Sequence, residues 1–345
     1  MVRSIQQRTN DFALGWPELR NHCRHFDNHS THDGNNGRMY CAVQTSLDKI
    51  HGADIAPKRR SHMKPMSQIP DILYHYCPSS AFPEILRSGV LWLTHESGLN
   101  DQREHVWPVP YIREEMQRQT TPDSVGFFGD VAKQFDLMMG DRTRNLFIGS
   151  FSSDGDVLSQ WRAYADDGNG FAIGFSQKAF SAKMQIPMTS FVDDHTIGLF
   201  PIQYDDSALK LVIKKIFESH LSATPIPNAA VINCVSELRN LALCFKNPAF
   251  REEKEWRVTY APMIMSSPER GDVRIIGALT SMQFRSTRYG VVPYFEMPFG
   301  QTESRENAIL EVVVGPRNQS QMVEMHLDSL GYHKAVVRRS SSSYR

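Results

Sequence analysis

Two carboxylates and a guanidinium stand at alternate positions of the chain, as Glu253, Glu255 and Arg257. The residues around them, including Trp256 and Tyr260, alternate as in a β-strand, so the charged side chains are predicted on one face and the aromatic ones on the other. Because such a row is costly to bury without partners, its face should border solvent or a cleft. If the face borders solvent, the row is simply part of a charged sheet surface. In a cleft, carboxylates exchange protons or stabilise positive charge, and a guanidinium pairs with them or with a phosphate.

Further candidate residues lie where predicted strands end or where the next helix begins. His75 and Tyr76 come near the end of one strand, and Ser150 and Ser152 near the end of another. Trp161 lies on the helix that follows those serines, which Asp156 is expected to cap. Each candidate also has a purely structural interpretation. The histidine can have its hydrogen bonds satisfied at a strand end, the serines can bond to the backbone, and the tryptophan can lie in the core.

The order of these elements predicts an α+β domain over residues 69–340. Runs with the composition of strands lie at 72–77, 90–94, 146–153, 171–175, 273–276, 291–295, 309–314 and 334–337. Helical spacing covers 109–119, 158–165, 208–221, 231–245 and 319–330, and Gly89 should end a further short helix. Two of these helices make a helical insertion at about 206–246, as packing or lid elements, and the basic tail from Arg338 is expected to fray.

The composition narrows the function classes. Among 345 residues, 38 Lys and Arg balance 38 Asp and Glu, which argues against strong non-specific binding to nucleic acid. Five cysteines without a CxxC pair indicate a reducing compartment, and no apolar run has the length of a membrane helix or a signal peptide. A cytoplasmic protein is expected. Residues 1–68 are polar and predicted to be mostly disordered, and Met66 is an alternative start; the segment 22–33 holds possible metal ligands in no recognised spacing.

Several pieces of the chain, taken in order, resemble the mainly bacterial family catalogued as domain of unknown function 2971. They are Leu73 to Tyr76, Asn100-Asp101 with Glu104, Ser150 to Ser152, Trp161 to Asp166 with Gly170, Ile173 to Phe175, Glu253 to Arg257, Ile309 to Gly315, and Ser341 to Arg345. The resemblance runs from about Ile72 to the C-terminus. Phe250 and Asn169 depart from it, standing where the family often has tryptophan and histidine.

A second resemblance is to ADP-ribosyltransferases, through a strand-borne histidine, a strand with Ser-Phe-Ser and a strand with Glu-x-Glu. It implies a split pair of mixed β-sheets with flanking helices around a cleft for NAD, which is a substrate, and it implies no metal. Glu255 would stabilise the positive charge that develops on the ribose, and Glu253 would orient or deprotonate the acceptor. His75 would anchor the adenosine-side ribose.

The same resemblance implies supporting roles for further residues. Tyr76 would stack beside His75, and Ser150 or Ser152 would hold Glu255 by a hydrogen bond. Arg257 would pair with a glutamate or meet the pyrophosphate. Trp161 would contact the ligand unless it belongs to the core.

Three function classes follow. The first is an ADP-ribosyltransferase-like enzyme that modifies a macromolecular acceptor, protein or nucleic acid, as a toxin or defence effector does. The second is a non-catalytic module of the same fold that binds a nucleotide or a partner. The third is a metal-dependent nuclease with Asp101, Glu104, Glu253 and Glu255 as ligands, which the neutral overall charge disfavours.

Overall fold

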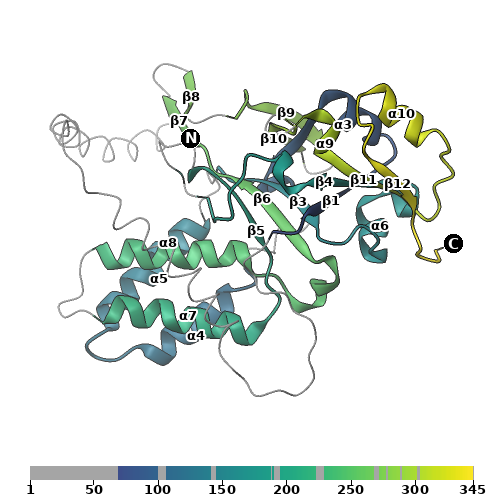
Figure 1. The fold of residues 1–345 in the computed structure, drawn as a ribbon. Coiled ribbons are helices and arrows are strands. Elements are labelled where there is room, and N and C mark those ends of the chain that lie inside the picture. The colour runs from purple at the N-terminus through teal and green to yellow at the C-terminus, as the bar shows by residue number, and fades with distance from the viewer. Residues whose placement is uncertain are drawn as a thin grey trace, which may run out of the picture. The chain divides into compact units, whose positions relative to one another are not determined.

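The computed structural model describes residues 69–99, 106–140, 145–187, 189, 195–222, 229–267, 272–276, 279–287, 290–300 and 304–344 (Figure 1). All of them belong to one of the two compact units of the chain, Tyr40–Arg345. The predicted N-terminal extension 1–68, including Met66, lies outside the described residues, as do Asn100, Asp101 and Glu104.

Ten strands within the described residues form one mixed sheet, which agrees with the predicted α+β class. They are β1 (Ile72–Cys77), β2 (Val90–His95), β3 (Phe147–Ser152), β4 (Phe171–Ser176), β5 (Ile197–Pro201), β6 (Glu255–Tyr260), β9 (Gln283–Thr287), β10 (Gly290–Pro298), β11 (Ile309–Val314) and β12 (Val336–Arg339). The main path runs β12-β11-β4-β1-β3-β2-β10-β9, and β6 joins β3 to β5. Strands β11 and β12 pair in parallel, and the other pairs of named strands that the structure describes are antiparallel. Strands β7 (Met263–Ser267) and β8 (Asp272–Ile276) pair separately.

The sheet forks at β3. One edge of β3 pairs with β6 from Phe147 to Ser152. On the other edge, β1 meets β3 only at Ser152, and β2 meets it only at Phe147 and Ile148. The segment 149–151 therefore lies between two diverging strands. The ADP-ribosyltransferase resemblance implies a split pair of mixed sheets; the structure has a mixed sheet that forks at β3.

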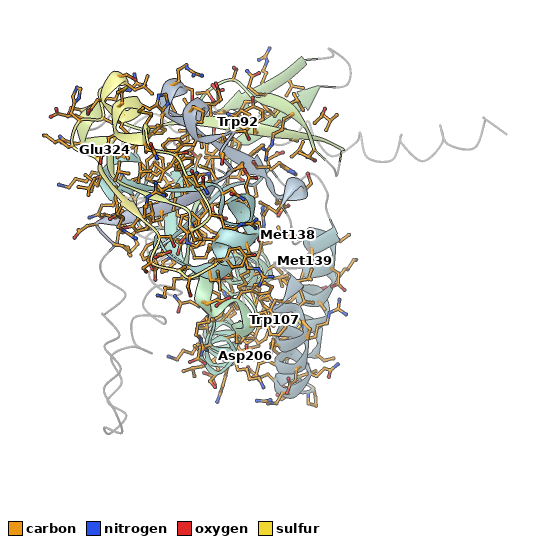
Figure 2. All side chains as sticks on the ribbon, turned by 90° about the vertical axis from the view of Figure 1, so that its right-hand side faces the viewer. Trp92, Trp107, Met138, Met139, Asp206 and Glu324 are labelled. Atoms are coloured by element: carbon orange, nitrogen blue, oxygen red, sulfur yellow. The ribbon has the colours of Figure 1, made fainter. Side chains whose placement is uncertain are left out.

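Four helices pack on one face of the sheet at strands β3 and β5. They are α4 (Val109–Gln119), α5 (Val125–Gly140), α7 (Asp206–Leu221) and α8 (Ala229–Cys244). They contact one another and share a core with Ile148 of β3 and Phe200 of β5. Figure 2 places Trp107 and Asp206 among these helices and Trp92 among the strands. No helix in the described part of the chain is long and apolar enough to cross a membrane.

The sequence interpretation missed α5. Three glycines, at 126, 129 and 140, lower its helix propensity. Phe128, Val131 and Phe135 nevertheless recur on one face, and all three are buried against the helical core. Tertiary packing therefore outweighs the weak local preference, and α5 completes the helical layer together with the predicted helices at 206–246.

The opposite face of the sheet carries the second core. Helices α3 (Phe82–Ser88), α9 (Arg305–Ala308) and α10 (Val323–Ser329) contribute to it. The aromatic face of β6 lies there as predicted, with Trp256 and Tyr260 buried beside Phe295. Gly89 ends α3 in the left-handed conformation, with φ of 67°, which confirms the predicted stop.

Asp156 anchors the C-terminal tail, which the sequence interpretation expected to fray. Its carboxylate accepts hydrogen bonds from Trp161 Nε1 at 2.8 Å, the Ser341 amide at 2.7 Å and the Ser341 hydroxyl at 2.8 Å. The hydroxyls of Ser340 and Ser342 donate to it as well. Asp156 was predicted to cap helix α6 (Leu158–Tyr164), but that helix has no side-chain cap. Burial raises the pKa of Asp156, and the hydrogen bonds outweigh that effect and lower it to about 2.

Replacing Asp156 with alanine should detach the tail and lower the free energy of unfolding by about 1–3 kcal/mol, since several hydrogen bonds to one charged group are lost. Amide exchange of residues 340–344 should become faster, which hydrogen-exchange mass spectrometry measures. Asp136→Ala, at an exposed ion pair with Arg113, is the control and should change neither quantity appreciably. Unchanged exchange in the tail of Asp156→Ala would contradict the anchoring role.

Candidate functional site

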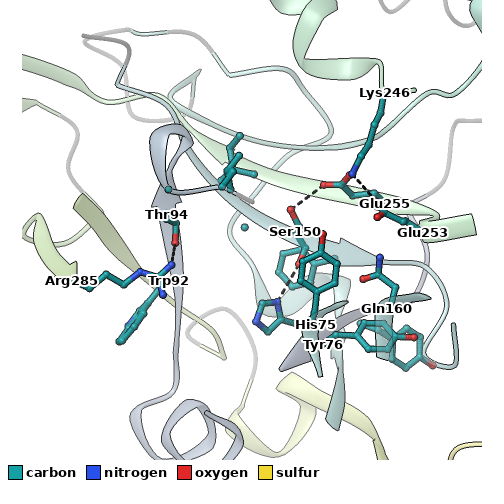
Figure 3. A pocket seen from close by; sticks show the side chains of 17 residues that line it. His75, Tyr76, Trp92, Thr94, Ser150, Gln160, Lys246, Glu253, Glu255 and Arg285 are labelled. Carbon is teal, nitrogen blue, oxygen red and sulfur yellow. Dashed lines mark hydrogen bonds and ion pairs between the residues drawn. The ribbon is translucent and has the colours of Figure 1, made fainter. Parts of the chain in front are cut away.

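A pocket of about 250 Å³ opens at the fork of the sheet (Figure 3). The predicted residues His75, Tyr76, Ser150, Glu253 and Glu255 line it. They come from β1, from β3 and from the segment that leads into β6. The fold therefore gathers at one place residues that the sequence analysis selected from distant parts of the chain.

The two glutamates reach the pocket by a different route from the predicted one. Strand β6 begins at Glu255, and Glu253 ends a 3₁₀ helix, Pro248–Glu253. The prediction of one continuous strand was wrong because Lys254 adopts a left-handed conformation, with φ of 47° and ψ of 45°. This turn lies between two carboxylates that both reach Lys246 Nζ.

Lys246 bridges the glutamates and is the main residue that the sequence analysis missed. Its Nζ lies 2.7 Å from Glu253 Oε2 and 3.3 Å from Glu255 Oε2, and its side chain is only 4% exposed. The ammonium also lies 4.7 Å from the centre of the Phe250 ring. The Lys246 amide donates to the Gln203 carbonyl at 3.0 Å, which fixes the backbone after α8. A buried cation thus compensates part of the charge of both carboxylates.

Arg257 completes the charge compensation at Glu255. Its Nε donates to Glu255 Oε1 at 2.7 Å and its Nη2 to Glu255 Oε2 at 3.1 Å. This is the pairing that the sequence analysis considered; Arg257 itself does not line the pocket. Burial raises the pKa of Glu255, but the charges of Arg257 and Lys246 and the hydrogen bonds from Arg257 and Ser150 outweigh it and lower the pKa to about 2. Glu255 is therefore ionised at neutral pH.

Ser150 connects Glu255 to His75 across the fork. The Ser150 hydroxyl donates to Glu255 Oε1 at 3.0 Å, which is the hydrogen bond that the resemblance implied for Ser150 or Ser152. The Ser150 carbonyl accepts from His75 Nδ1 at 3.1 Å, which requires the proton on that nitrogen because a carbonyl only accepts. Burial lowers the pKa of His75, and the hydrogen bond to Ser150 offsets only part of this. His75 is thus a neutral imidazole whose Nε2 bears a lone pair.

Of the other predicted residues, Ser152 and Trp161 do not line the pocket, and Trp161 packs against Tyr76, which does. The Ser152 hydroxyl donates to the Glu253 carbonyl at 2.7 Å and is itself buried. Trp161 is 0% exposed, so it takes the core role that was its structural alternative. Tyr76 packs edge-on against Trp161 at 4.9 Å, and its hydroxyl donates to the Asp154 carbonyl at 2.9 Å.

The opposite wall of the pocket comes from β2 and β9 and was not predicted. Trp92, Thr94 and Arg285 form it, and Figure 3 shows them across the pocket from Lys246 and Glu255. Leu91 and Leu93 lie in the core, so the alternation of β2 exposes Trp92 and turns Thr94 to the same side. The sequence signal for this wall was a tryptophan at an outward-facing position of a strand. Arg285 gives no such signal, because it reaches the site through the pairing of strands in the folded sheet.

A metal site is not supported by the side chains that the structure describes. No group of three or more potential His, Cys, Asp or Glu ligands lies together among them. Between Glu253 and Glu255, where the nuclease interpretation needs a metal, the structure has the ammonium of Lys246. The other two proposed ligands, Asp101 and Glu104, lie outside the described residues.

Residues 160–258 match the family model described as Protein of unknown function (DUF2971). The matched segment runs from α6 to β6, so it includes Lys246, Glu253, Glu255 and Arg257 but neither His75 nor the β2–β9 wall. It is shorter than the resemblance expected from Ile72 to the C-terminus. No curated protein and no solved structure gives a significant match to the chain.

Proposed function

Because residues 160–258 match a family model whose description assigns no activity, we propose a function from the pocket itself: an ADP-ribosyltransferase-like enzyme that cleaves NAD and modifies a macromolecular acceptor. The supporting observation is the hydrogen bond of 3.0 Å from Ser150 to Glu255, on a serine whose carbonyl also binds His75. It holds an ionised carboxylate in a pocket beside a neutral imidazole.

The chemistry follows from the charge at Glu255. When the bond between ribose C1′ and the nicotinamide nitrogen breaks, nicotinamide leaves with the electron pair and the ribose becomes an oxocarbenium-like cation. A carboxylate that remains ionised stabilises this cation. An acceptor hydroxyl or water then adds to C1′ and loses a proton, for which Glu253 is the base.

Glu255 must exchange one of its partners to do this. Its two oxygens already accept four donors, from Ser150, Lys246 and twice from Arg257, which fills the capacity of a carboxylate. The contact with Lys246 is the longest of the four, at 3.3 Å, and Lys246 keeps Glu253 at 2.7 Å. A ribose hydroxyl can therefore replace Lys246 at Glu255 without leaving the ammonium unpaired.

The same saturation of Glu255 favours a second candidate function, a module that binds a nucleotide or a partner without turnover. In that case the compensated carboxylates stay paired and shape the pocket, as in many buried ion-pair networks. Under this alternative NAD or a relative stabilises the protein and remains intact.

Nicotinamide release separates the two candidates. The full chain is incubated with NAD, free nicotinamide is followed by chromatography, and Ser150→Ala is compared with the parent protein. We expect release by the parent and a loss of about tenfold in Ser150→Ala, because one hydrogen bond to a charged group is removed. Ser153→Ala is the matched control, since the Ser153 hydroxyl is exposed and lies 3.5 Å from the Lys254 carbonyl, at the limit of a hydrogen bond.

Two results would count against the enzyme. Intact NAD together with a raised melting temperature favours the binding module. If NAD stays intact even when cell extract supplies acceptors, and NAD does not shift the melting temperature of the protein, NAD is not the ligand.

A further inference from the structure

We propose that Arg285, held between Trp92 and Thr94, is an anion subsite that binds the diphosphate of the dinucleotide. This inference rests on the proposed function for the identity of the ligand, and on the wall of the pocket for the site itself. Arg285 comes from β9, at the end of the main path of the sheet, and reaches across β10 to β2.

The first observation is that the guanidinium is fixed. Arg285 Nη2 donates to Thr94 Oγ1 at 2.9 Å, and Thr94 is only 7% exposed. The guanidinium carbon lies 5.3 Å from the centre of the Trp92 ring, within the range of a cation–π contact. Trp92 in turn packs against Tyr294 at 4.5 Å. A planar group held on an aromatic face loses little rotamer freedom when an anion binds.

The second observation concerns the charge of the guanidinium. Within the described residues no carboxylate makes an ion pair with Arg285, and its Nε is buried without a hydrogen-bond partner. Lys246 and Arg257, across the pocket, differ because the glutamates pair with them. Burial lowers the pKa of Arg285, and the nearby Tyr294 opposes this only in part. A partly buried cation with a donor to spare is a site for an anion.

The chemical class follows from the geometry. A guanidinium offers parallel donors that match the oxygens of a phosphate, and the ring of Trp92, 46% exposed, offers a flat surface beside it. The pocket that Arg285 lines also contains His75, Ser150 and Glu255. A dinucleotide places its diphosphate between two riboses, so an anion subsite opposite Glu255 fits the middle of such a ligand. Contact with the pyrophosphate was one of the two roles considered for Arg257, but Arg257 has the other role, because its guanidinium pairs with Glu255.

Binding measurements on the full chain test the subsite without requiring turnover. Calorimetry compares ADP-ribose, which carries the diphosphate, with nicotinamide riboside, which carries no phosphate. In Arg285→Gln we expect the Kd for ADP-ribose to rise at least about tenfold, whereas that for nicotinamide riboside changes less than about twofold. Arg285→Lys, which keeps the charge but not the fork of donors, should give an intermediate Kd. Arg87→Gln, at an exposed ion pair on α3, is the control and should bind as the parent does.

The outcomes separate this inference from the proposed function. Arg285-dependent binding of ADP-ribose without nicotinamide release from NAD supports the subsite and contradicts the enzyme. Equal Kd values for ADP-ribose in the parent and in Arg285→Gln overturn the subsite even where nicotinamide is released. Failure of the parent to bind ADP-ribose, ADP and inorganic pyrophosphate at millimolar concentration overturns it as well.

Discussion

Glu255→Gln is expected to lower the rate of nicotinamide release from NAD by at least about a hundredfold, since loss of one preorganised electrostatic group commonly costs that much. Glutamine keeps the volume of the side chain and one acceptor oxygen, whereas it removes the charge and replaces the other acceptor oxygen with an amide donor. The charge matters because the pKa of Glu255 is lowered to about 2, so the parent protein has the ionised form throughout the neutral range. Quantitative chromatography of nicotinamide at saturating NAD measures the effect.

The control for this variant must distinguish a loss of catalytic rate from a loss of folded protein. Arg257 and Lys246 each lose a counter-charge in Glu255→Gln, so the free energy of unfolding should fall by about 2–4 kcal/mol. Near-ultraviolet circular dichroism at the assay temperature establishes the folded fraction, and the rate is divided by it. Glu252→Gln is the matched variant, because Glu252 is an exposed neighbour in the same segment. Retention of turnover in folded Glu255→Gln would remove Glu255 from the mechanism.

Short-range patterns predicted many of the elements well. Strand β1 and helix α4 have the predicted limits, 72–77 and 109–119, because hydrophobic alternation or helical spacing is strong within each segment. Prediction failed where a residue adopts an unusual backbone conformation that the local sequence pattern does not indicate. The run from Glu253 reads as a strand, but the left-handed Lys254 ends the 3₁₀ helix and lets the strand start two residues later.

Only some of the residues that line the pocket could be predicted from the sequence. Ser150 and Glu255 were linked through a resemblance, and their hydrogen bond is present. Lys246 carries no such signal, because a lysine after an apolar helix is most often at the surface. Here it is buried, and it directly follows the bridge between Gln203 and Phe245. Arg285 enters the pocket through strand pairing across β10, and such pairing is not encoded in any local stretch of sequence.

Lys246→Met is expected to lower the free energy of unfolding at pH 7 by about 3–5 kcal/mol, because it leaves the buried Glu253 without its closest cation. Methionine preserves most of the volume, so the loss reflects charge and not a cavity. Chemical denaturation with equal m-values in parent and variant measures it. Lys254→Met is the control: its ammonium pairs with Asp154 at 2.8 Å, but its side chain is 53% exposed, so about 0–1 kcal/mol is expected.

The dependence on pH gives Lys246→Met a second readout. Because the pKa of Glu255 is lowered from 4.5 to about 2 in the folded parent, its ion pairs stabilise the fold above pH 4.5, and this contribution is lost as the pH falls towards 2. Without Lys246 the folded-state pKa of Glu255 should lie closer to its ordinary value, so the contribution becomes smaller and its loss is complete at a higher pH. The double variant Lys246→Met with Glu253→Gln should recover part of the stability, since it removes the carboxylate that was left unpaired. If Lys246→Met destabilises the protein no more than Lys254→Met does, the bridge between the two glutamates contributes nothing to the fold, and the buried ion pairs need another explanation.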